Sequence, residues 1–310
     1  MLLLMMRRLA SMLLIMAVVS FILFVIFESN KLAVAGKVLG PYSSVEQREL
    51  WLEQNGYNRG FLVRYAEWVG RAVRGDFGDS IRFKAPVSDL LWDRLGNTGI
   101  LALFVFAIMI PLSLLLGVLS GMREGSGLDR SISFISILTT SVPEFASATF
   151  LVALFVFYLG WLPGTSSMTG GFNPVELVLP VAVLVLYDFG YVARMTRASM
   201  AEVMTLQYIR TAVLKGLPRK TVIVGHALRN ALIAPFTVIV LQLNWLLSGV
   251  IVVEVFFAYR GFGKLLFDGA TFGDIYLIEA CTLVAVFVAV FSQFISDVGY
   301  TLLNPRIRFG

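Results

Sequence analysis

The chain has very few of the side chains from which proteins build metal and redox sites. Its 310 residues include one cysteine, Cys281, and one histidine, His226. A single cysteine excludes a disulfide framework and a cysteine-based zinc site. A single histidine excludes bis-histidine haem ligation within one chain. Charged residues are also scarce, at 15% of the chain, against about 25% in ordinary soluble domains.

The sequence also lacks the motifs of nucleotide binding and hydrolysis. It contains no G-x-x-x-x-G-K-[ST] motif, so it cannot hold nucleotide phosphates in a P-loop. No H-E-x-x-H, G-x-S-x-G or paired-carboxylate motif is present, and one histidine leaves little choice of general base. We therefore expect no catalytic residue, no metal site and no cofactor bound by this chain.

Apolar residues are abundant instead. They make up 58% of the chain, and the mean hydropathy is +0.82, whereas ordinary soluble domains are about 45–50% apolar. This composition excludes a disordered chain, a collagen and a soluble nucleic-acid-binding protein, so we expect no nucleic-acid partner. It predicts an all-α polytopic membrane protein in contact with lipid, in which the net charge of +5 reflects retained cytoplasmic Lys and Arg.

Six stretches are apolar enough to cross a bilayer, which needs about 20 residues per helix. The first has an apolar run of 19 residues, longer than the core of a signal peptide, and therefore favours a retained anchor over a cleaved signal. The fourth is short and contains Asp188. Pro111, Pro143 and Pro180 are expected to kink the helices that contain them. The spans are 9–27, 98–121, 132–159, 177–193, 231–257 and 276–303.

The distribution of Lys and Arg predicts the orientation. The 194–229 loop carries seven of these residues, whereas the 160–176 loop carries none. Both termini are therefore expected in the cytoplasm. The predicted organisation is an N-terminal transmembrane helix (1–27), an exported segment (28–97), a membrane core (98–303) that includes the 194–229 loop, and a cytoplasmic tail (304–310). Within the exported segment we expect helices over 45–55 and 61–73, followed by a tight polar loop over 75–80.

The 194–229 loop is too apolar for a plain linker. Gly216-Leu217-Pro218 is typical of the end of a helix, and a helix is expected to resume over 221–232. A short helix between basic flanks fits the groove of another protein, but it equally fits a helix that lies on lipid headgroups. The apolar residues at helical spacing are Met200, Val203, Met204, Tyr208, Ile209, Ala212 and Val213.

Five polar residues lie inside the predicted spans, where such groups are costly and usually face a cavity or a partner. They predict a polar translocation path. The alternatives are hydrogen bonds between helices or, for Glu254, a position at the exported end of its span. These residues are Glu144, Asp188, Gln242, Asn244 and Glu254.

Several motifs together resemble the dipeptide/oligopeptide B-type branch of binding-protein-dependent ABC importer permeases. Gly216 matches the glycine of the family's coupling loop, and Arg210 stands where its usual Glu would be. The motifs are R-T-A-V-L-K-G-L at 210–217, H-A-L-R-N-A-L at 226–232, G-D-F-G-D-S at 75–80, R-M-T-R-A-S-M-A-E-V at 194–203 and N-P-R-I-R at 304–308.

This resemblance implies the type I ABC importer transmembrane fold, with six transmembrane helices and a cytoplasmic coupling helix, in a bacterial inner membrane. It implies a non-catalytic subunit that pairs with a second homologous permease, two ATPase subunits and an exported substrate-binding protein. ATP and Mg would be bound by the ATPases. The coupling residues would be Arg210, Thr211, Ala212, Lys215, Gly216 and Leu217.

The implied cargo is a di- or oligopeptide, while oligosaccharides, opines and nickel chelates are alternatives within the same class. A stand-alone secondary transporter or channel is the alternative from another class. It predicts inverted repeats or matching broken helices in the two halves of the chain, and no such repeat is visible in the sequence.

Overall fold

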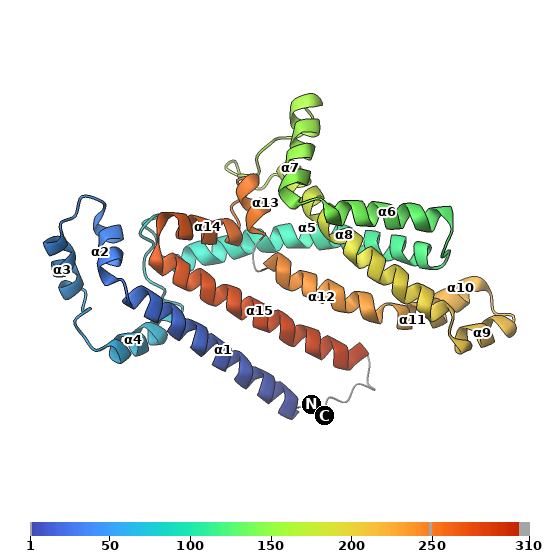
Figure 1. Cartoon of the computed structure of the whole chain (residues 1–310), viewed down its shortest axis with the longest axis horizontal. Coiled ribbons are helices and arrows are strands. Elements are labelled where there is room, and N and C mark those ends of the chain that lie inside the picture. Colours follow the sequence, from blue (N-terminus) through green and yellow to red (C-terminus); the bar gives the residue numbers. More distant parts are fainter. Residues whose placement is uncertain (1, 248–249, 304–310) are drawn as a thin grey trace. The chain divides into compact units, whose positions relative to one another are not determined.

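The computed structural model describes residues 2–247 and 250–303 (Figure 1). The regular structure of these residues is helical, apart from one isolated bridge between Asp79 and Pro86, so the predicted all-α class is confirmed. Four helices are long and apolar enough to cross a bilayer, and the number rises to six if each of two bent helix pairs is one span. This number agrees with the six predicted spans. The predicted tail at 304–310, with its N-P-R-I-R motif, lies outside the described residues.

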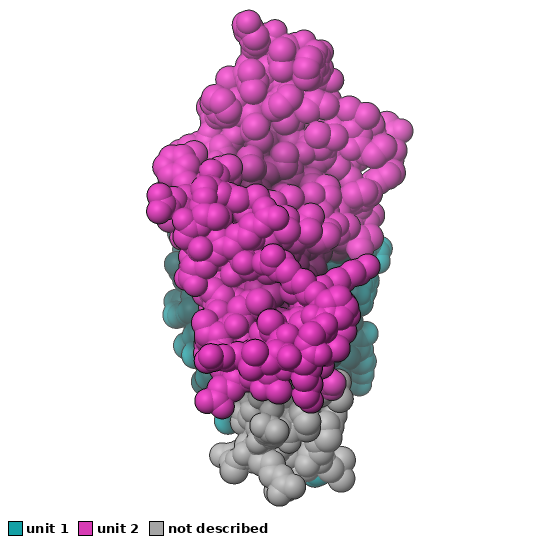
Figure 2. All heavy atoms as spheres, turned by 90° about the vertical axis from the view of Figure 1, so that its right-hand side faces the viewer, with its two compact units in different colours: residues 1–98, 260–291 teal, residues 99–259, 292–310 magenta. Residues whose placement is uncertain are grey.

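The chain divides into two compact units, coloured separately in Figure 2. Unit 1 contains residues 1–98 and 260–291, and unit 2 contains residues 99–259 and 292–310. Each unit has its own cluster of buried apolar side chains. Two long helices, α5 (Val87–Gly121) and α15 (Ile275–Leu303), contribute residues to both units.

Unit 1 contains four helices before α5. They are α1 (Leu2–Glu28), α2 (Lys31–Leu39), α3 (Val45–Gln54) and α4 (Phe61–Val73). Ser44 begins α3 with a capping box, because its hydroxyl accepts from the Gln47 N–H at 3.2 Å and its own N–H donates to Gln47 at 2.9 Å. The predicted helices at 45–55 and 61–73 are therefore confirmed.

Two further helices of unit 1 were not expected. No helix was predicted over 28–44 or 258–275, but the structure has α2 and also α14 (Phe262–Phe272). Helix α2 buries Val34 and Ala35, and α14 buries Phe262 and Leu265. Both are short, so their stability comes from tertiary packing and not from a long apolar run.

The polar loop at 75–80 is anchored by a buried aspartate. The Ser80 hydroxyl donates to Asp274 Oδ2 at 2.6 Å, and the Arg82 backbone N–H donates to the same oxygen at 2.9 Å. Asp274 also accepts from the N–H of Leu277 at 3.3 Å and so caps the first turn of α15. One carboxylate thus fixes both the loop and a helix start.

Unit 2 is organised around α8 (Pro174–Met204), which contacts helices that precede and follow it in the sequence (Figure 1). The helices before α8 are α6 (Gly127–Ser141), α7 (Glu144–Val152) and the π-helix η1 (Ala153–Tyr158). Those after it are α9 (Gln207–Leu214), α10 (Arg219–Thr221), the π-helix η2 (Val222–Ala227), α11 (Leu228–Ala231), α12 (Ile233–Leu247) and α13 (Ile251–Phe256).

Glycines allow α5 and α8 to approach closely. A Cβ on Gly117 would lie 2.6 Å from the carbonyl oxygen of Ala193, and one on Gly121 would lie 2.6 Å from that of Arg197. Neither distance is compatible with a larger residue. Small residues at such crossings are typical of helix packing in membranes.

The third predicted span, 132–159, is divided into two helices, so the kink expected at Pro143 is confirmed. Helix α6 ends at Ser141 and α7 begins at Glu144, and the two are bent by 99°. Pro143 causes the break, because its ring has no N–H and forces the preceding residue out of the helical region. Val142 is accordingly extended, with φ −89° and ψ 125°. Pro111 and Pro180, in contrast, lie inside the continuous helices α5 and α8.

The bounds of two other spans also need correction. The fifth, 231–257, is divided among α11, α12 and α13, with a 50° bend before α12. The fourth, 177–193, is too short, because α8 begins at Pro174 after the Asn173 cap and continues to Met204. Met200 and Val203 are buried in that last part. Packing therefore extends the helix beyond its most apolar stretch.

Candidate functional site

Helix α9 is a short helix held against the rest of unit 2 by one face. Ile209 and Ala212 are buried, at 2% and 6% exposure. They pack in one cluster with Met200 and Val203 of α8 and with Val222, Ala227 and Ala231 of the segment that follows. The Asn230 side chain also donates to the Tyr208 hydroxyl at 2.7 Å. The position of α9 is thus fixed by the chain itself.

A Schellman turn ends α9. The N–H of Gly216 donates to the carbonyl of Val213 at 3.0 Å, and the N–H of Leu217 donates to the carbonyl of Ala212 at 3.3 Å. Gly216 has φ +75°, a conformation that side chains with a Cβ rarely adopt. The predicted helix end at Gly216 is therefore confirmed. Apart from its two neighbours in the chain, no described residue has an atom within 4 Å of the position that a Cβ would take, so the requirement for glycine is conformational and not steric.

The face of α9 that points away from the chain combines basic and apolar groups. Arg210, Thr211, Lys215 and Leu217 are exposed, as the coupling prediction requires, whereas Ala212 is buried in the cluster below. Val213 and Leu214 are also exposed, at 56% and 79%. These two were not among the predicted coupling residues, although they lie on the same helical face as Arg210.

An ion pair joins α8, the helix that precedes α9, to α6. Arg197 of α8 places Nε and Nη2 each 2.8 Å from Asp129 of α6, one nitrogen on each carboxylate oxygen. Asp129 is 3% exposed and also accepts from the Ser120 hydroxyl and the Gly125 N–H. Sequence reasoning missed this pair, because its members lie 68 residues apart.

A second candidate site surrounds Asp188, which is only 1% exposed. Gln242 of α12 donates to Asp188 Oδ1, whereas Oδ2 has no hydrogen-bond partner among the described residues. Burying a carboxylate oxygen without a partner is costly, and such groups inside a membrane are typical of functional sites.

Both residues line a cavity of about 260 Å³ within unit 2. Tyr187 and Trp245 stack beside it with ring centroids 5.5 Å apart. This aromatic wall was not predicted, although Tyr187, Tyr191 and Arg194 recur at helical spacing around Asp188. The complete lining is Thr140, Tyr187, Asp188, Tyr191, Arg194, Gln242 and Trp245.

Glu144 and Glu254 are not among the residues that line this cavity. Glu144 is partly buried in the first turn of α7, after Pro143. Glu254 is fully buried in α13. The side chain of Asn244 lies outside the described part of the structure. Of the four predicted residues whose side chains are described, Asp188 and Gln242 are in contact, and Glu144 lies near enough to Asp188 for their charges to interact.

Within the described residues, no group of three or more His, Cys, Asp and Glu side chains is arranged to hold a metal ion. The two candidate sites therefore offer contact surfaces and hydrogen-bonding groups, and neither combines a nucleophile with a general base. Such sites are suited to docking and to solute passage.

Comparison with known proteins identifies relatives along nearly the whole chain. It is 36% identical over 279 residues to the oligopeptide transport system permease protein AppB of Bacillus subtilis, covering 88% of each chain. It is 30% identical over 318 residues to the dipeptide transport system permease protein DppB of Alkalihalophilus pseudofirmus, covering 95% of each chain.

A solved structure of the inward-facing MetNI methionine ABC transporter has a similar fold. The TM-score is 0.51 at 17% identity, covering 69% of this chain and 94% of that chain. Residues 113–309 match the family described as binding-protein-dependent transport system inner membrane component. The chain therefore belongs to this family, as a multi-pass, non-catalytic permease subunit of an ABC importer.

Proposed function

We propose that this chain forms half of the translocation path of an ATP-driven importer of di- or oligopeptides. It pairs with a second homologous permease and works with two ATPase subunits and an exported binding protein. The permease names of AppB and DppB, over 88% and 95% of their lengths, support the peptide cargo. Oligosaccharides, opines and nickel chelates are the alternatives that an uptake assay separates. The family's dependence on a binding protein argues against a stand-alone transporter.

The observation that carries the coupling role is the division of α9 into two faces. Ile209 and Ala212 fix the helix to its own chain, while Val213 and Leu214 are exposed between Arg210 and Lys215. A helix that lay on lipid would use its main apolar face for attachment, but that face is already buried. We therefore infer that the outward face docks in a cleft of the ATPase, where apolar contacts surrounded by charged groups give both affinity and register.

The Asp188 cavity is our candidate for contact with the solute. Its unpartnered carboxylate oxygen can accept a hydrogen bond from the amide or the terminal ammonium of a passing peptide. Gln242 holds the other oxygen in place. The stacked rings of Tyr187 and Trp245 add apolar surface that tolerates different side chains.

We further propose that both termini and the 194–229 loop are cytoplasmic and that the segment 28–97 is exported. The excess of Lys and Arg in that loop supports this orientation. It puts α9 on the side of the membrane where ATP is available.

Co-purification followed by reconstitution tests the function. The chain, expressed with its genetic neighbours, should elute with a second permease and two ATPases. In proteoliposomes, the complex should take up labelled tripeptide only when both binding protein and ATP are supplied. Uptake of an oligosaccharide, an opine or a nickel chelate in place of peptide would overturn the cargo. Uptake by the chain alone would overturn the importer assignment.

A further inference from the structure

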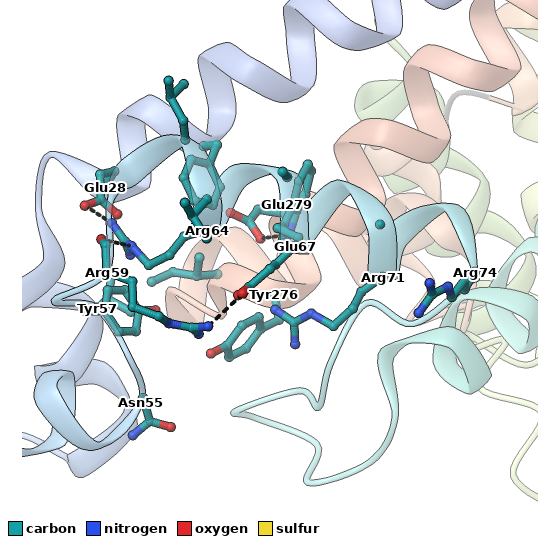
Figure 3. A pocket seen from close by; sticks show the side chains of 18 residues that line it. Glu28, Asn55, Tyr57, Arg59, Arg64, Glu67, Arg71, Arg74, Tyr276 and Glu279 are labelled. Atoms are coloured by element: carbon teal, nitrogen blue, oxygen red, sulfur yellow. Dashed lines mark hydrogen bonds and ion pairs between the residues drawn. The ribbon is translucent and has the colours of Figure 1, made fainter.

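A polar cavity in unit 1 lies along α4 and beside the start of α15 (Figure 3). Its volume is about 1,030 Å³. Side chains of both charge signs line it together with aromatic rings, and the importer role proposed for the chain does not use them. The charged lining residues are Glu28, Arg59, Arg64, Glu67, Arg71, Arg74 and Glu279.

Two ion pairs take up part of this charge. Arg64 pairs with Glu28, and Arg59 Nη1 lies 2.7 Å from Glu67 Oε1, as the dashed lines in Figure 3 show. Arg64 is 9% exposed, so the first pair is part of the cavity wall. Glu28 also pairs with Lys31, so the charged lining residues outside these ion pairs are Arg71, Arg74 and Glu279.

The remaining groups are two guanidiniums and one carboxylate. Arg71 and Arg74 of α4 are exposed and form no salt bridge within the described part of the chain. Glu279 of α15 is 5% exposed and accepts one hydrogen bond, from Trp68 Nε1 at 3.0 Å. Burial raises the pKa of the Tyr57 hydroxyl above its ordinary value, and this hydroxyl is hydrogen-bonded to that of Tyr276.

The cavity lies at the edge of the membrane. The apolar stretch of α1 ends at Ile26, just before Glu28, and that of α15 begins at Ile275, just before Tyr276 and Glu279. Trp and Tyr are typical of the level of lipid headgroups, and Trp68, Tyr57 and Tyr276 all line the cavity. Its wall also includes Leu62 and Val63, which are 70% and 53% exposed.

We propose that this cavity binds a phospholipid through a phosphoethanolamine headgroup. Arg71 and Arg74 hold the phosphate, because guanidinium groups pair with phosphate oxygens in bidentate geometry. Glu279 accepts from the ammonium group, and the neighbouring aromatic rings favour the same cation. Leu62 and Val63 contact the start of the acyl chains. Arg71, Arg74 and Glu279 together carry both positive and negative charge, and so does the phosphoethanolamine headgroup.

Lipid retention by the purified importer complex tests the proposal. Native mass spectrometry would follow dioleoyl phosphatidylethanolamine, phosphatidylglycerol and phosphatidylcholine added in turn. The Arg71→Gln/Arg74→Gln variant should retain all three about tenfold less, since it loses charge-assisted hydrogen bonds to phosphate. Glu279→Gln should lose only the preference for phosphatidylethanolamine. Lys84→Gln, which removes an exposed charge elsewhere in the 28–97 segment, should behave as wild type.

Two further experiments test whether the ligand is an intact lipid or a soluble headgroup compound, and whether the variants act through charge or through misfolding. Soluble glycerophosphoethanolamine should not displace the lipid at equal concentration, because it lacks acyl chains; displacement would overturn the lipid as ligand. Arg71→Lys/Arg74→Lys keeps the charge and should retain lipid better than the Gln pair. Equal retention by wild type and the Gln pair would overturn the proposal. If the Gln pair weakens only the binding of the exported binding protein, the cavity is a protein interface and the proposal is wrong.

Discussion

Arg197 and Asp129 form a two-point ion pair, with N–O distances of 2.8 Å on both sides of the carboxylate. The pair joins the last turns of α8 to the first turn of α6, ten residues before α9 begins at Gln207. Because Asp129 is buried and the contact is bidentate, we expect it to be stiffer than an ordinary surface salt bridge, although the Arg197 side chain is 29% exposed. The ion pair therefore helps to fix the position of the α8 end from which the chain continues into α9.

Removing the carboxylate of this pair should destabilise unit 2. Asp129→Ala leaves the Arg197 guanidinium without its main partner and removes the acceptor of Ser120 and Gly125. We expect a loss of about 2 kcal/mol in the free energy of unfolding, which corresponds to a thermal midpoint roughly 5 °C lower. Thermal unfolding of the purified chain in detergent measures it.

Glu124→Ala is the matched control for that variant. Glu124 approaches the same guanidinium at 3.5 Å but is 59% exposed, so its removal should leave the midpoint close to that of wild type. Similar losses from both variants would contradict the special role of Asp129.

The long-range pairs of this structure could not be predicted from the sequence. Nothing in a single sequence marks Asp129 as the partner of Arg197, or Asp274 as the acceptor for Ser80, because each pair is separated by many residues. In contrast, the α4 bounds and the helix end at Gly216 depend on neighbours in the sequence, and both agree with the structure.

The span bounds were less predictable for a different reason. Hydropathy locates apolar stretches, but the path of the backbone depends on local breaks and on packing. Pro143 divides one predicted span, and burial of Met200 and Val203 lengthens another. Of the candidate path, Asp188 and Gln242 are adjacent because α8 packs on α12, whereas hydropathy alone could not separate them from Glu144 or Glu254.

Asp188→Asn tests whether the cavity around this residue serves the solute. Asn keeps the shape and the hydrogen bond with Gln242 but removes the charge, so peptide uptake should fall about tenfold, as for the loss of one charge-assisted hydrogen bond. The amount of assembled complex should not change. Uptake at equal membrane abundance and size-exclusion chromatography measure the two quantities.

Asp93→Asn provides the control, because the Asp93 side chain is 64% exposed and lies outside the cavity. It should transport as wild type does. Unchanged uptake by Asp188→Asn would remove this residue from the solute path. Loss of the assembled complex would show a structural role in its place.

Reporter fusions test the proposed orientation. The 194–229 loop carries seven Lys and Arg and the 160–176 loop none, and basic loops remain in the cytoplasm. An alkaline phosphatase fusion after Gly171 should therefore be active, and one after Lys220 inactive. A green fluorescent protein fusion should give the reverse result at each site. Identical reports from both positions would contradict the six-span topology.

The turn at Gly216 provides the most direct test of coupling. Gly216→Val places a β-branched residue at φ +75°, which costs on the order of 1–3 kcal/mol and disfavours the Schellman turn that ends α9. Because Gly216 is exposed and, beyond its two chain neighbours, the described part of the protein has no atom within 4 Å of the position that a Cβ would take, packing of the helices themselves should be preserved. Gly216→Asn is the permissive variant, since Asn adopts positive φ more readily. Gly225→Val is the matched control in η2, at a glycine that also has open space but no positive φ.

The decisive measurement is peptide uptake together with peptide-stimulated ATP hydrolysis by the reconstituted importer, at equal membrane abundance of each variant. Coupling through α9 predicts that Gly216→Val lowers both activities about tenfold, while Gly216→Asn and Gly225→Val remain close to wild type. Normal uptake and normal stimulation of hydrolysis with Gly216→Val would contradict the coupling role of this helix.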